Sequence, residues 1–244
     1  MKALILAAGY GTRLYPLVQN TAKALLKVKN KPLVDHILDR IKDLDGLNEV
    51  IVVTNNKFNN DFKTWAETHS DIGFNIEIVN DKTETPDDRL GSIGDINFVL
   101  DNVNVDDDLL IVGGDNLFNF NLDDYVDLTK QKPNSVTIGL YDIENLQDAK
   151  KFGVVVIDDS RKITSFEEKP QNPKSSLIAM CFYYLPKNTL NLVSDYLREI
   201  DKSDTAGDYI RWLCKNNEVY GFNFTGKWYD IGSIEAYQTA EKNF

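Results

Sequence analysis

Apolar runs alternate with amphipathic segments along the first half of the chain. Apolar runs predict buried strands at residues 2–7, 50–53 and 109–112, and residues 75–79 also look like a strand. Between them, apolar residues at helical spacing predict a helix that begins at Pro32 and ends before Gly46, and further helices at 58–69 and about 92–100. Buried strands separated by helices are typical of parallel sheets with right-handed crossovers. The first half is therefore predicted to be a Rossmann-like α/β sheet, mostly parallel and flanked by helices.

The pattern changes after about residue 134. Strand-like segments follow at 135–141, 153–158, 162–168 and 178–185, then helices near 188–200 and 207–216, a strand at 219–224 and a terminal helix near 233–242. No Pro/Gly/Ser-rich linker, internal repeat or low-complexity tract separates the two halves. We expect a single domain, residues 1–244, in which 1–134 form the first part and 135–244 a smaller β-rich part with C-terminal helices.

Composition narrows the classes of partner. The 244 residues are 42% hydrophobic and carry a net charge of −11, which argues against broad binding to nucleic acid or to an anionic membrane. A few Lys and Arg side chains and backbone N–H groups can still hold phosphates in an acidic protein. The first apolar stretch, Ala3 to Ala8, is too short for a signal sequence or a membrane span, and no later stretch approaches the length of a membrane span.

The two cysteines and two histidines show no spacing typical of a catalytic or metal site. Cys181 and Cys214 lie in apolar surroundings without CxxC or Cys/His spacing, which predicts two reduced thiols in a cytoplasmic protein. His36 and His69 are isolated in the sequence, which argues against a histidine triad or a zinc site.

A glycine-rich segment, Leu6-Ala7-Ala8-Gly9-Tyr10-Gly11-Thr12-Arg13-Leu14, follows the first predicted strand. Gly9 and Gly11 permit a left-handed backbone and close approach of a ligand, and Arg13 follows within reach of a phosphate held there. A dinucleotide fingerprint would need glycine at the position of Leu14, and the P-loop motif is absent. Taken alone, the segment is also compatible with a simple tight turn.

Three further side chains are candidates for phosphate chemistry. Lys23 stands between Ala22 and Ala24, either as a second cation for phosphate or as an ordinary lysine with its head in solvent. Asp115 follows the strand at 109–112, so it lies at the carboxyl edge of the sheet, either as a Mg²⁺ ligand or as a turn cap. Asp230 has apolar and aromatic neighbours in the sequence and needs a partner, which a shared metal ion would supply.

The segment Phe166-Glu167-Glu168-Lys169-Pro170 ends a predicted strand. Strand alternation places Glu167 and Lys169 on one side and Glu168 on the other, unless a twist at Pro170 brings Glu168 and Lys169 into one pocket. The other interpretation is a solvated charge cluster.

In their order and spacing, these segments resemble the nucleotidyltransferases that make NDP-sugars, and most of all the glucose-1-phosphate thymidylyltransferases. The matching stretches are Leu6–Leu14, Lys23-Ala24-Leu25-Leu26 with Lys31-Pro32-Leu33, Leu90-Gly91-Ser92, Gly113-Gly114-Asp115-Asn116, Phe152-Gly153-Val154, Phe166–Pro170 and Trp228–Gly232. They span nearly the whole chain, so the resemblance is specific.

The resemblance implies that a nucleoside triphosphate and a sugar 1-phosphate give an NDP-sugar and pyrophosphate, with Mg²⁺ as cofactor. It makes 1–134 the nucleotide-binding part and 135–244 the sugar-binding part. It implies catalytic roles for Arg13, Lys23 and Asp115; nucleotide binding by Leu6, Ala8, Gly9, Gly11, Thr12, Arg13, Asn80 and Gly91; sugar-phosphate binding by Gly153, Glu168, Lys169, Ala179 and Tyr183; and Mg²⁺ binding by Asp115 and Asp230.

The sequence departs from the family pattern mainly at the positions where the family binds the base and the sugar. Asn80 stands in place of the usual glutamine, the loop 80–90 is longer, Ala8 replaces a frequent glycine and Cys181 replaces a sugar-pocket glycine. We expect dTTP or UTP as nucleotide. A cytidylyl- or guanylyltransferase, a phosphocholine-like acceptor and a non-catalytic nucleotide-sensing relative are the alternatives. The sequence is compatible with a homo-oligomer.

Overall fold

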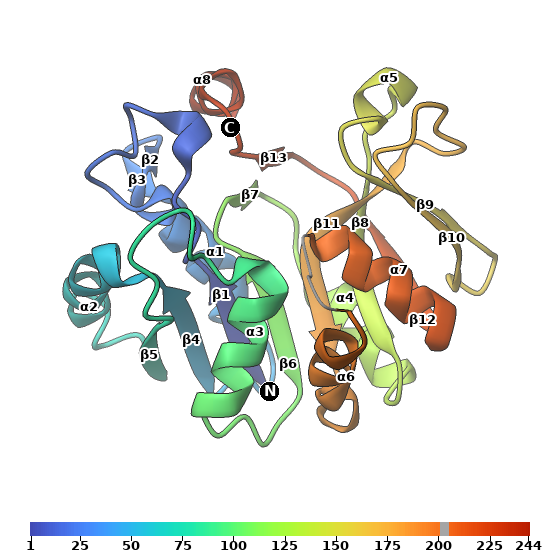
Figure 1. Cartoon of the computed structure of the whole chain (residues 1–244), viewed down its shortest axis with the longest axis horizontal. Helices are drawn as coiled ribbons and strands as arrows, with labels where there is room; N and C mark the ends of the chain where they lie inside the picture. The colour runs from blue at the N-terminus through green and yellow to red at the C-terminus, as the bar shows by residue number, and fades with distance from the viewer. Residues whose placement is uncertain (201–204) are drawn as a thin grey trace.

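A computed structural model describes residues 1–200 and 205–244, and within them nine strands from both halves of the chain form one sheet (Figure 1). Seven of them lie in the order β12 (Val219–Phe224), β8 (Val136–Asp142), β11 (Leu177–Leu185), β6 (Leu109–Gly113), β1 (Lys2–Leu6), β4 (Glu49–Thr54) and β5 (Asn75–Asn80). The other two, β9 (Gly153–Ile157) and β10 (Ile163–Glu168), extend from the first half of β11.

Strands β6, β1, β4 and β5 run parallel, so their carboxyl ends meet at one edge of the sheet. Leu6 at the end of β1 lies opposite Val53 on one side and Gly113 on the other. Beyond the strands, Gly114 N donates to Leu6 O at 2.9 Å. The glycine-rich segment and the turn that carries Asp115 therefore leave the sheet side by side.

Helices cover both faces of the sheet. On one face α1 (Leu33–Ile41), α2 (Asn59–Glu67) and α4 (Asp123–Gln131) pack against side chains that include Ile5, and on the other α3 (Gly91–Asn102), α6 (Asn191–Glu199) and α7 (Ala206–Asn216) pack against side chains that include Leu4. Because both faces of β1 are buried, its sequence is continuously apolar. The predicted α/β fold with a mixed, mostly parallel sheet is confirmed.

Several elements differ from the sequence prediction. Helix α1 ends at Ile41, and turns occupy the residues up to Gly46. Helices α4 and α5 (Leu146–Ala149) were not predicted, nor were two short strand pairs. These pairs are β2 (Lys27–Val28) with β3 (Lys31–Pro32), and β7 (Asn116–Phe118) with β13 (Trp228–Asp230). Elements of two or three residues are too short to show a periodic pattern.

The C-terminal segment packs against the segment that follows the glycine-rich loop. Helix α8 (Ile234–Asn243) begins after Ser233, whose hydroxyl accepts from Ala236 N. Tyr237 in α8 donates to Lys27 O at 2.9 Å, and Leu14 and Ile231 belong to one small apolar cluster. Strand β13 and α8 therefore help to hold the loop that carries Arg13. Over residues 1–200 and 205–244, no helix combines the length and apolar character needed to cross a membrane.

Candidate active site

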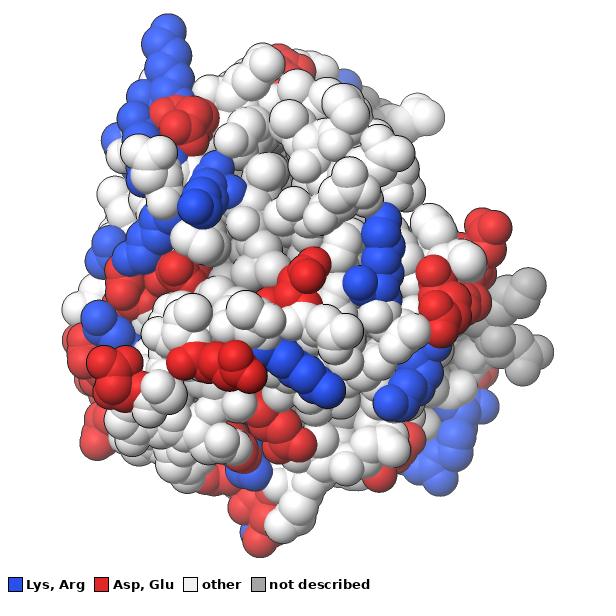
Figure 2. Space-filling view, turned by 90° about the vertical axis from the view of Figure 1, so that its left-hand side faces the viewer, with Lys and Arg blue, Asp and Glu red and all other residues white. Residues whose placement is uncertain are grey.

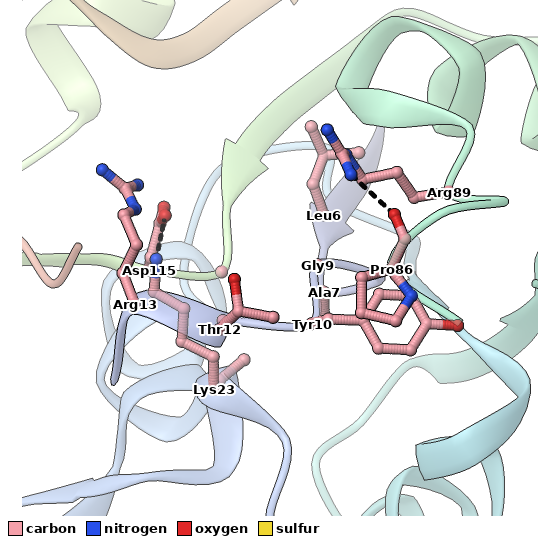
Figure 3. A pocket seen from close by; sticks show the side chains of 13 residues that line it. Leu6, Ala7, Gly9, Tyr10, Thr12, Arg13, Lys23, Pro86, Arg89 and Asp115 are labelled. Carbon is pink, nitrogen blue, oxygen red and sulfur yellow. Dashed lines mark hydrogen bonds and ion pairs between the residues drawn. The ribbon is translucent and has the colours of Figure 1, made fainter. Parts of the chain in front are cut away.

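A cavity of about 360 Å³ opens at the carboxyl edge of the sheet, beyond the end of β1 (Figure 3). Figure 3 shows Arg13, Lys23 and Asp115 on one side of it, and Tyr10, Pro86 and Arg89 on the other. The remaining lining residues are Leu6, Ala7, Gly9, Gly11, Thr12, Ala24 and Gly114. Ligand sites of open α/β sheets lie at this edge of the sheet.

The two glycines of the loop have different tasks. Gly11 has φ 61°, a left-handed conformation, and a Cβ atom there would lie 3.0 Å from Val18 Cγ2. A Cβ atom on Gly9 would meet nothing within 4 Å. Gly11 is therefore required by the fold of the loop, whereas Gly9 keeps the space in front of the loop open for a ligand.

Lys23 is directed into the site. Its Nζ lies 2.6 Å from Asp115 Oδ2, and its side chain is only 15% exposed. Ala22 and Ala24 on either side are buried. The interpretation of Lys23 as an ordinary solvent-facing lysine does not fit this burial, and its ammonium group is available to neutralise phosphate beside the loop.

Asp115 and Asp230 come together through the short strands β7 and β13. Asp230 pairs with Asn116 in the ladder, and Ile231 N donates to Asp115 O at 3.0 Å. Burial and the negative charge of Asp115 raise the pKa of Asp230 to about 6, although Lys23 and Arg13 act in the opposite direction. A Cβ atom built on Gly232 would lie 3.5 Å from both Arg13 Nη2 and Asp230 Oδ1, so these two charged groups are neighbours.

These two carboxylates fit a magnesium ion. No group of three or more Asp, Glu, His or Cys side chains within residues 1–200 and 205–244 forms a metal cage. Mg²⁺ in phosphate sites is usually held by one or two carboxylates, with waters and substrate phosphates completing the shell. Burial, and after it the negative charge of Asp115, raise the pKa of Asp230, so a cation bound beside the two carboxylates would favour its ionised form.

A second cavity of about 300 Å³ adjoins the first and shares Leu6, Gly9, Arg89 and Asp115 with it. It is also lined by Ala8, Asp81, Gly91, Ser92, Asp95, Gly113, Cys181 and Ala206. The predicted residues Ala8 and Gly91 therefore lie together, beside Cys181 from β11. Two adjoining cavities that share Asp115 are suited to two substrates that react with each other.

Glu168 and Lys169 meet at the end of β10. Lys169 has φ 45°, which breaks the strand alternation, and its Nζ lies 3.5 Å from Glu168 Oε1. A Cβ atom on Gly153 would lie 3.1 Å from Glu168 Oε2, and one on Gly207 would overlap the same carboxylate. The twist considered from the sequence thus brings Glu168 and Lys169 together, with Gly153 against Glu168. Glu167 pairs instead with Lys174.

Six predicted binding residues line neither cavity: Asn80, Gly153, Glu168, Lys169, Ala179 and Tyr183. Asp230 lines a neighbouring cavity instead. Asn80 donates to Asn56 Oδ1 at 2.7 Å and accepts from Lys82 N, so its amide bonds to the turn after β4 and to its own loop. Tyr183 is 3% exposed, in the apolar cluster on the face of the sheet that α3, α6 and α7 cover, and Ala179 precedes it on β11.

The sequence did not single out Arg89, Tyr10, Asp81 and Asp95, which line the cavities. Arg89 donates to Pro86 O, and none of the ion pairs found within residues 1–200 and 205–244 involves it. For Asp95 there was a signal: an acidic residue interrupts the apolar helical pattern of Ile93, Ile96 and Val99.

Nucleophilic side-chain chemistry finds no support here. Both cysteines are free, and burial raises the pKa of Cys181 to about 12 and that of Cys214 to about 11, so both thiols stay protonated. His36 is bonded to Val28 O, and His69 lies near Asp35. On the face shown in Figure 2, basic and acidic side chains are interspersed instead of forming one continuous basic surface.

The chain is similar to known proteins along its whole length. The family model described as nucleotidyl transferase matches residues 2–244. The bifunctional protein GlmU of Methanocaldococcus jannaschii is 30% identical over 237 residues, covering 95% of this chain and 51% of that protein. GlmU of Methanococcus aeolicus is also 30% identical, with 95% and 51% covered. The chain thus spans about half the length of these curated relatives.

Two solved structures share the fold. A protein assigned as a glucose-1-phosphate thymidylyltransferase from Bacillus anthracis, solved in complex with sucrose, superposes with a TM-score of 0.84 at 26% identity, covering 99% of this chain and 94% of that one. A UDP-glucose pyrophosphorylase with bound UDP-glucose gives a TM-score of 0.80 at 22% identity, covering 98% and 96%, and supports the fold alone. With a family match from residue 2 to residue 244, the chain belongs to the nucleotidyl transferase family, the family of the sugar-nucleotide pyrophosphorylases.

Proposed function

We propose that the chain transfers a nucleotidyl group from a nucleoside triphosphate to a hexose 1-phosphate and releases pyrophosphate. The observation that carries the proposal is the convergence of Arg13 and Lys23 on Asp115 and Asp230, in front of a glycine loop with open space at Gly9. Cations beside a backbone loop suit a triphosphate, and paired carboxylates beside them suit its metal.

The proposed reaction is an in-line displacement. A phosphate oxygen of the sugar 1-phosphate attacks the α-phosphorus, while the bond from that phosphorus to the bridging oxygen breaks and pyrophosphate leaves on the opposite side. The attacking oxygen is already an anion, so no general base is needed, and catalysis comes from positioning and charge neutralisation. Arg13 and Lys23 neutralise the leaving pyrophosphate, the Gly9–Arg13 backbone holds the triphosphate, and Glu168 and Lys169 orient the acceptor.

Asp115 and Asp230 would hold Mg²⁺. When bound, this ion supplies positive charge to the α-phosphate oxygens in the transition state. The ion pair with Lys23 orients the Asp115 carboxylate.

We propose dTTP or UTP as the nucleotide, because the thymidylyltransferase relative at 26% identity covers nearly the whole chain. The test is a matrix of dTTP, UTP, CTP, ATP and GTP against glucose, galactose, mannose and N-acetylated amino-hexose 1-phosphates, with Mg²⁺ and a pyrophosphate readout. Release of pyrophosphate with dTTP or UTP and one hexose 1-phosphate supports the proposal. No release in any pair would contradict it.

One observation favours a second acceptor class. A cavity of about 500 Å³ beside Arg13 and Asp230 is lined by Tyr141, Phe152 and Trp228. Aromatic faces next to carboxylates suit a quaternary ammonium group such as that of phosphocholine. A competition assay distinguishes the two acceptors. Excess phosphocholine should leave the yield of NDP-hexose unchanged if the hexose 1-phosphate is the acceptor. It should replace NDP-hexose by the phosphocholine product if phosphocholine is the acceptor.

A further inference from the structure

Four buried polar side chains connect the glycine-rich loop to helix α3, and two of them line the second cavity. Tyr10 lies between Gly9 and Gly11, and its hydroxyl is 3.1 Å from Thr83 Oγ1. Thr83 Oγ1 donates to Asp81 at 2.9 Å and 3.1 Å, and Thr83 N donates to Asp81 Oδ1 at 2.8 Å. The carboxyl group of Asp81 meets that of Asp95 in α3. All four residues are at most 6% exposed.

The two carboxyl groups need a proton between them. Within residues 1–200 and 205–244, no Lys, Arg or His is ion-paired with either of them, and Asp95 Oδ1 is buried without a hydrogen bond from an N–H group or hydroxyl. Burial and the charge of Asp81 raise the pKa of Asp95 to about 8, and burial raises the pKa of Asp81 as well. Near neutral pH the Asp95 carboxyl therefore keeps its proton and donates it to Asp81.

The charged side chains nearby do not offset the repulsion between the Asp81 and Asp95 carboxylates. Asp88 adds negative potential at Asp81, and Asp88 and Glu84 do so at Tyr10. Arg89 is the cation that lines the same cavity. Helix α3 packs against β1, α6 and α7, and no charged side chain of their described residues contributes to the pKa of Asp95.

We propose that Tyr10, Thr83, Asp81 and Asp95 form a hydrogen-bonded chain that positions the Gly9–Arg13 loop for the triphosphate, and that the proton shared by the two carboxyl groups maintains this position. The inference rests on the proposed function for its kinetic consequence. These are positioning residues, because they act through the loop and do not touch the reacting atoms. When the proton is lost, two adjacent anions repel each other in a buried site, so Asp81 shifts and takes Thr83 and Tyr10 with it.

The experiment measures KM for the nucleotide and for the sugar 1-phosphate across the pH range around 8. For the unaltered chain, KM for the nucleotide should rise up to about tenfold per pH unit above the pKa of the pair, while KM for the sugar 1-phosphate stays level. In Asp95→Asn the amide donates an N–H to Asp81 and cannot ionise, so the alkaline rise should disappear. Tyr10→Phe breaks the chain at its other end and should raise KM for the nucleotide about fivefold at every pH.

Asp101→Asn is the matched control, since Asp101 is exposed on the same helix and bonds only to Asn97 among the hydrogen-bonding groups of the described residues. It should keep the pH profile of the unaltered chain. The proposal is overturned if Asp95→Asn retains the alkaline rise, or if both KM values rise together.

A second measurement needs no substrate. The unfolding free energy of the unaltered chain should fall as pH rises toward about 8, because the folded form resists ionisation of Asp95 and the unfolded form does not. Asp95→Asn should lose this slope, and a double-mutant cycle with Tyr10→Phe should show non-additive stabilities. If Asp95→Asn loses the pH slope and the stabilities are non-additive while no pyrophosphate is released, the hydrogen-bonded chain is supported and the proposed function is contradicted. If pyrophosphate is released but the slope persists in Asp95→Asn, the network fails.

Discussion

At the scale of single residues, the site depends on balancing positive and negative charge within a few ångströms. Lys23 is the clearest case, because it is paired with Asp115 at 2.6 Å before any substrate arrives. In the proposed reaction, this ammonium group binds the carboxylate in the resting site and a phosphate once the substrate is bound. We therefore expect its removal to affect catalysis more than affinity.

We expect Lys23→Met to lower the kcat for pyrophosphate release about 100- to 1000-fold, the range for loss of a group that stabilises developing charge. Lys130→Met is the control, since Lys130 is 53% exposed and pairs with Asp45 far along the chain. Steady-state assays with a pyrophosphate readout compare the two variants. Activity of Lys23→Met within a few-fold of the unaltered chain would exclude the proposed role of this lysine.

Asp230 predicts a dependence on pH and metal. Its folded-state pKa of about 6 lies above its ordinary value of 3.8, so folding stability is greatest below the ordinary value and falls as pH rises through about 6. In metal-free buffer, Asp230→Asn should therefore be more stable than the unaltered chain above about pH 6, by roughly 2–3 kcal/mol. Mg²⁺ should raise the Tm of the unaltered chain and have less effect on the variant.

Thermal unfolding with EDTA and with Mg²⁺, at several pH values, measures both effects. The exposed Asp101→Asn substitution serves again as control. An Asp230→Asn variant that is less stable than the unaltered chain throughout, with an undiminished response to Mg²⁺, would contradict the assignment of Asp230 as a buried metal ligand.

At the scale of elements, we expect the two glycines of the loop to have different roles, one in stability and one in ligand binding. Gly11→Ala places a Cβ in a left-handed conformation and 3.0 Å from Val18, so we expect it to cost about 1–2 kcal/mol of stability. Gly9→Ala meets no neighbour in the fold and should leave the Tm nearly unchanged, while it raises KM for the nucleotide. Denaturant unfolding and kinetics on both variants test this division. Equal losses of stability would show that the two glycines have the same role.

A comparison of the elements shows which strands and helices could be predicted from the sequence. Strands such as β1 and β6 were predictable because burial on both faces makes them continuously apolar. Helix α4 was missed although Tyr125, Val126 and Leu128 form its buried side, because two aspartates in its first turn look like a loop. The pairs β2–β3 and β7–β13 form through tertiary contacts, and no local pattern of two or three residues can indicate them.

Site residues that directly follow a strand could be predicted from the sequence. The side-chain contacts and backbone conformation of loop residues could not. Gly9, Arg13 and Asp115 follow β1 and β6, and the structure gathers them in one cavity. For Asn80, nucleotide binding stays a prediction; its side chain bonds to Asn56, a contact between segments 24 residues apart that the sequence does not indicate. The left-handed conformation of Lys169, which brings it to Glu168, also depends on the local fold.

At the scale of the whole molecule, the two halves share one sheet and contribute side chains to the apolar clusters on both of its faces. Strand β11 from the second half pairs with β6 from the first, and Phe182 and Phe224 pack edge-on or tilted against Tyr125 of α4. The boundary near residue 134 stays a prediction for the division of binding tasks. It does not separate two independent hydrophobic cores.

We therefore expect a fragment of residues 1–134 to be unable to fold on its own, because β6 would lose β11 and Tyr125 would lose its aromatic partners. Circular dichroism and amide-proton NMR dispersion of the purified fragment test this. The full chain, as control, should unfold in one cooperative transition. A fragment with native-like dispersion and a cooperative melt would show that the first part is a domain by itself.

The pairing of β13 with β7 also sets an order of events during synthesis on the ribosome. Arg13, Lys23 and Asp115 leave the exit tunnel long before Asp230, and β7 waits for its partner strand until the last turns of the chain emerge. A nascent chain stalled before residue 228 carries the phosphate-binding loop and lacks one of the two proposed metal ligands. If Asp230 is needed for the proposed reaction, catalysis should begin only once translation has passed β13, and products that terminate before it should be inactive.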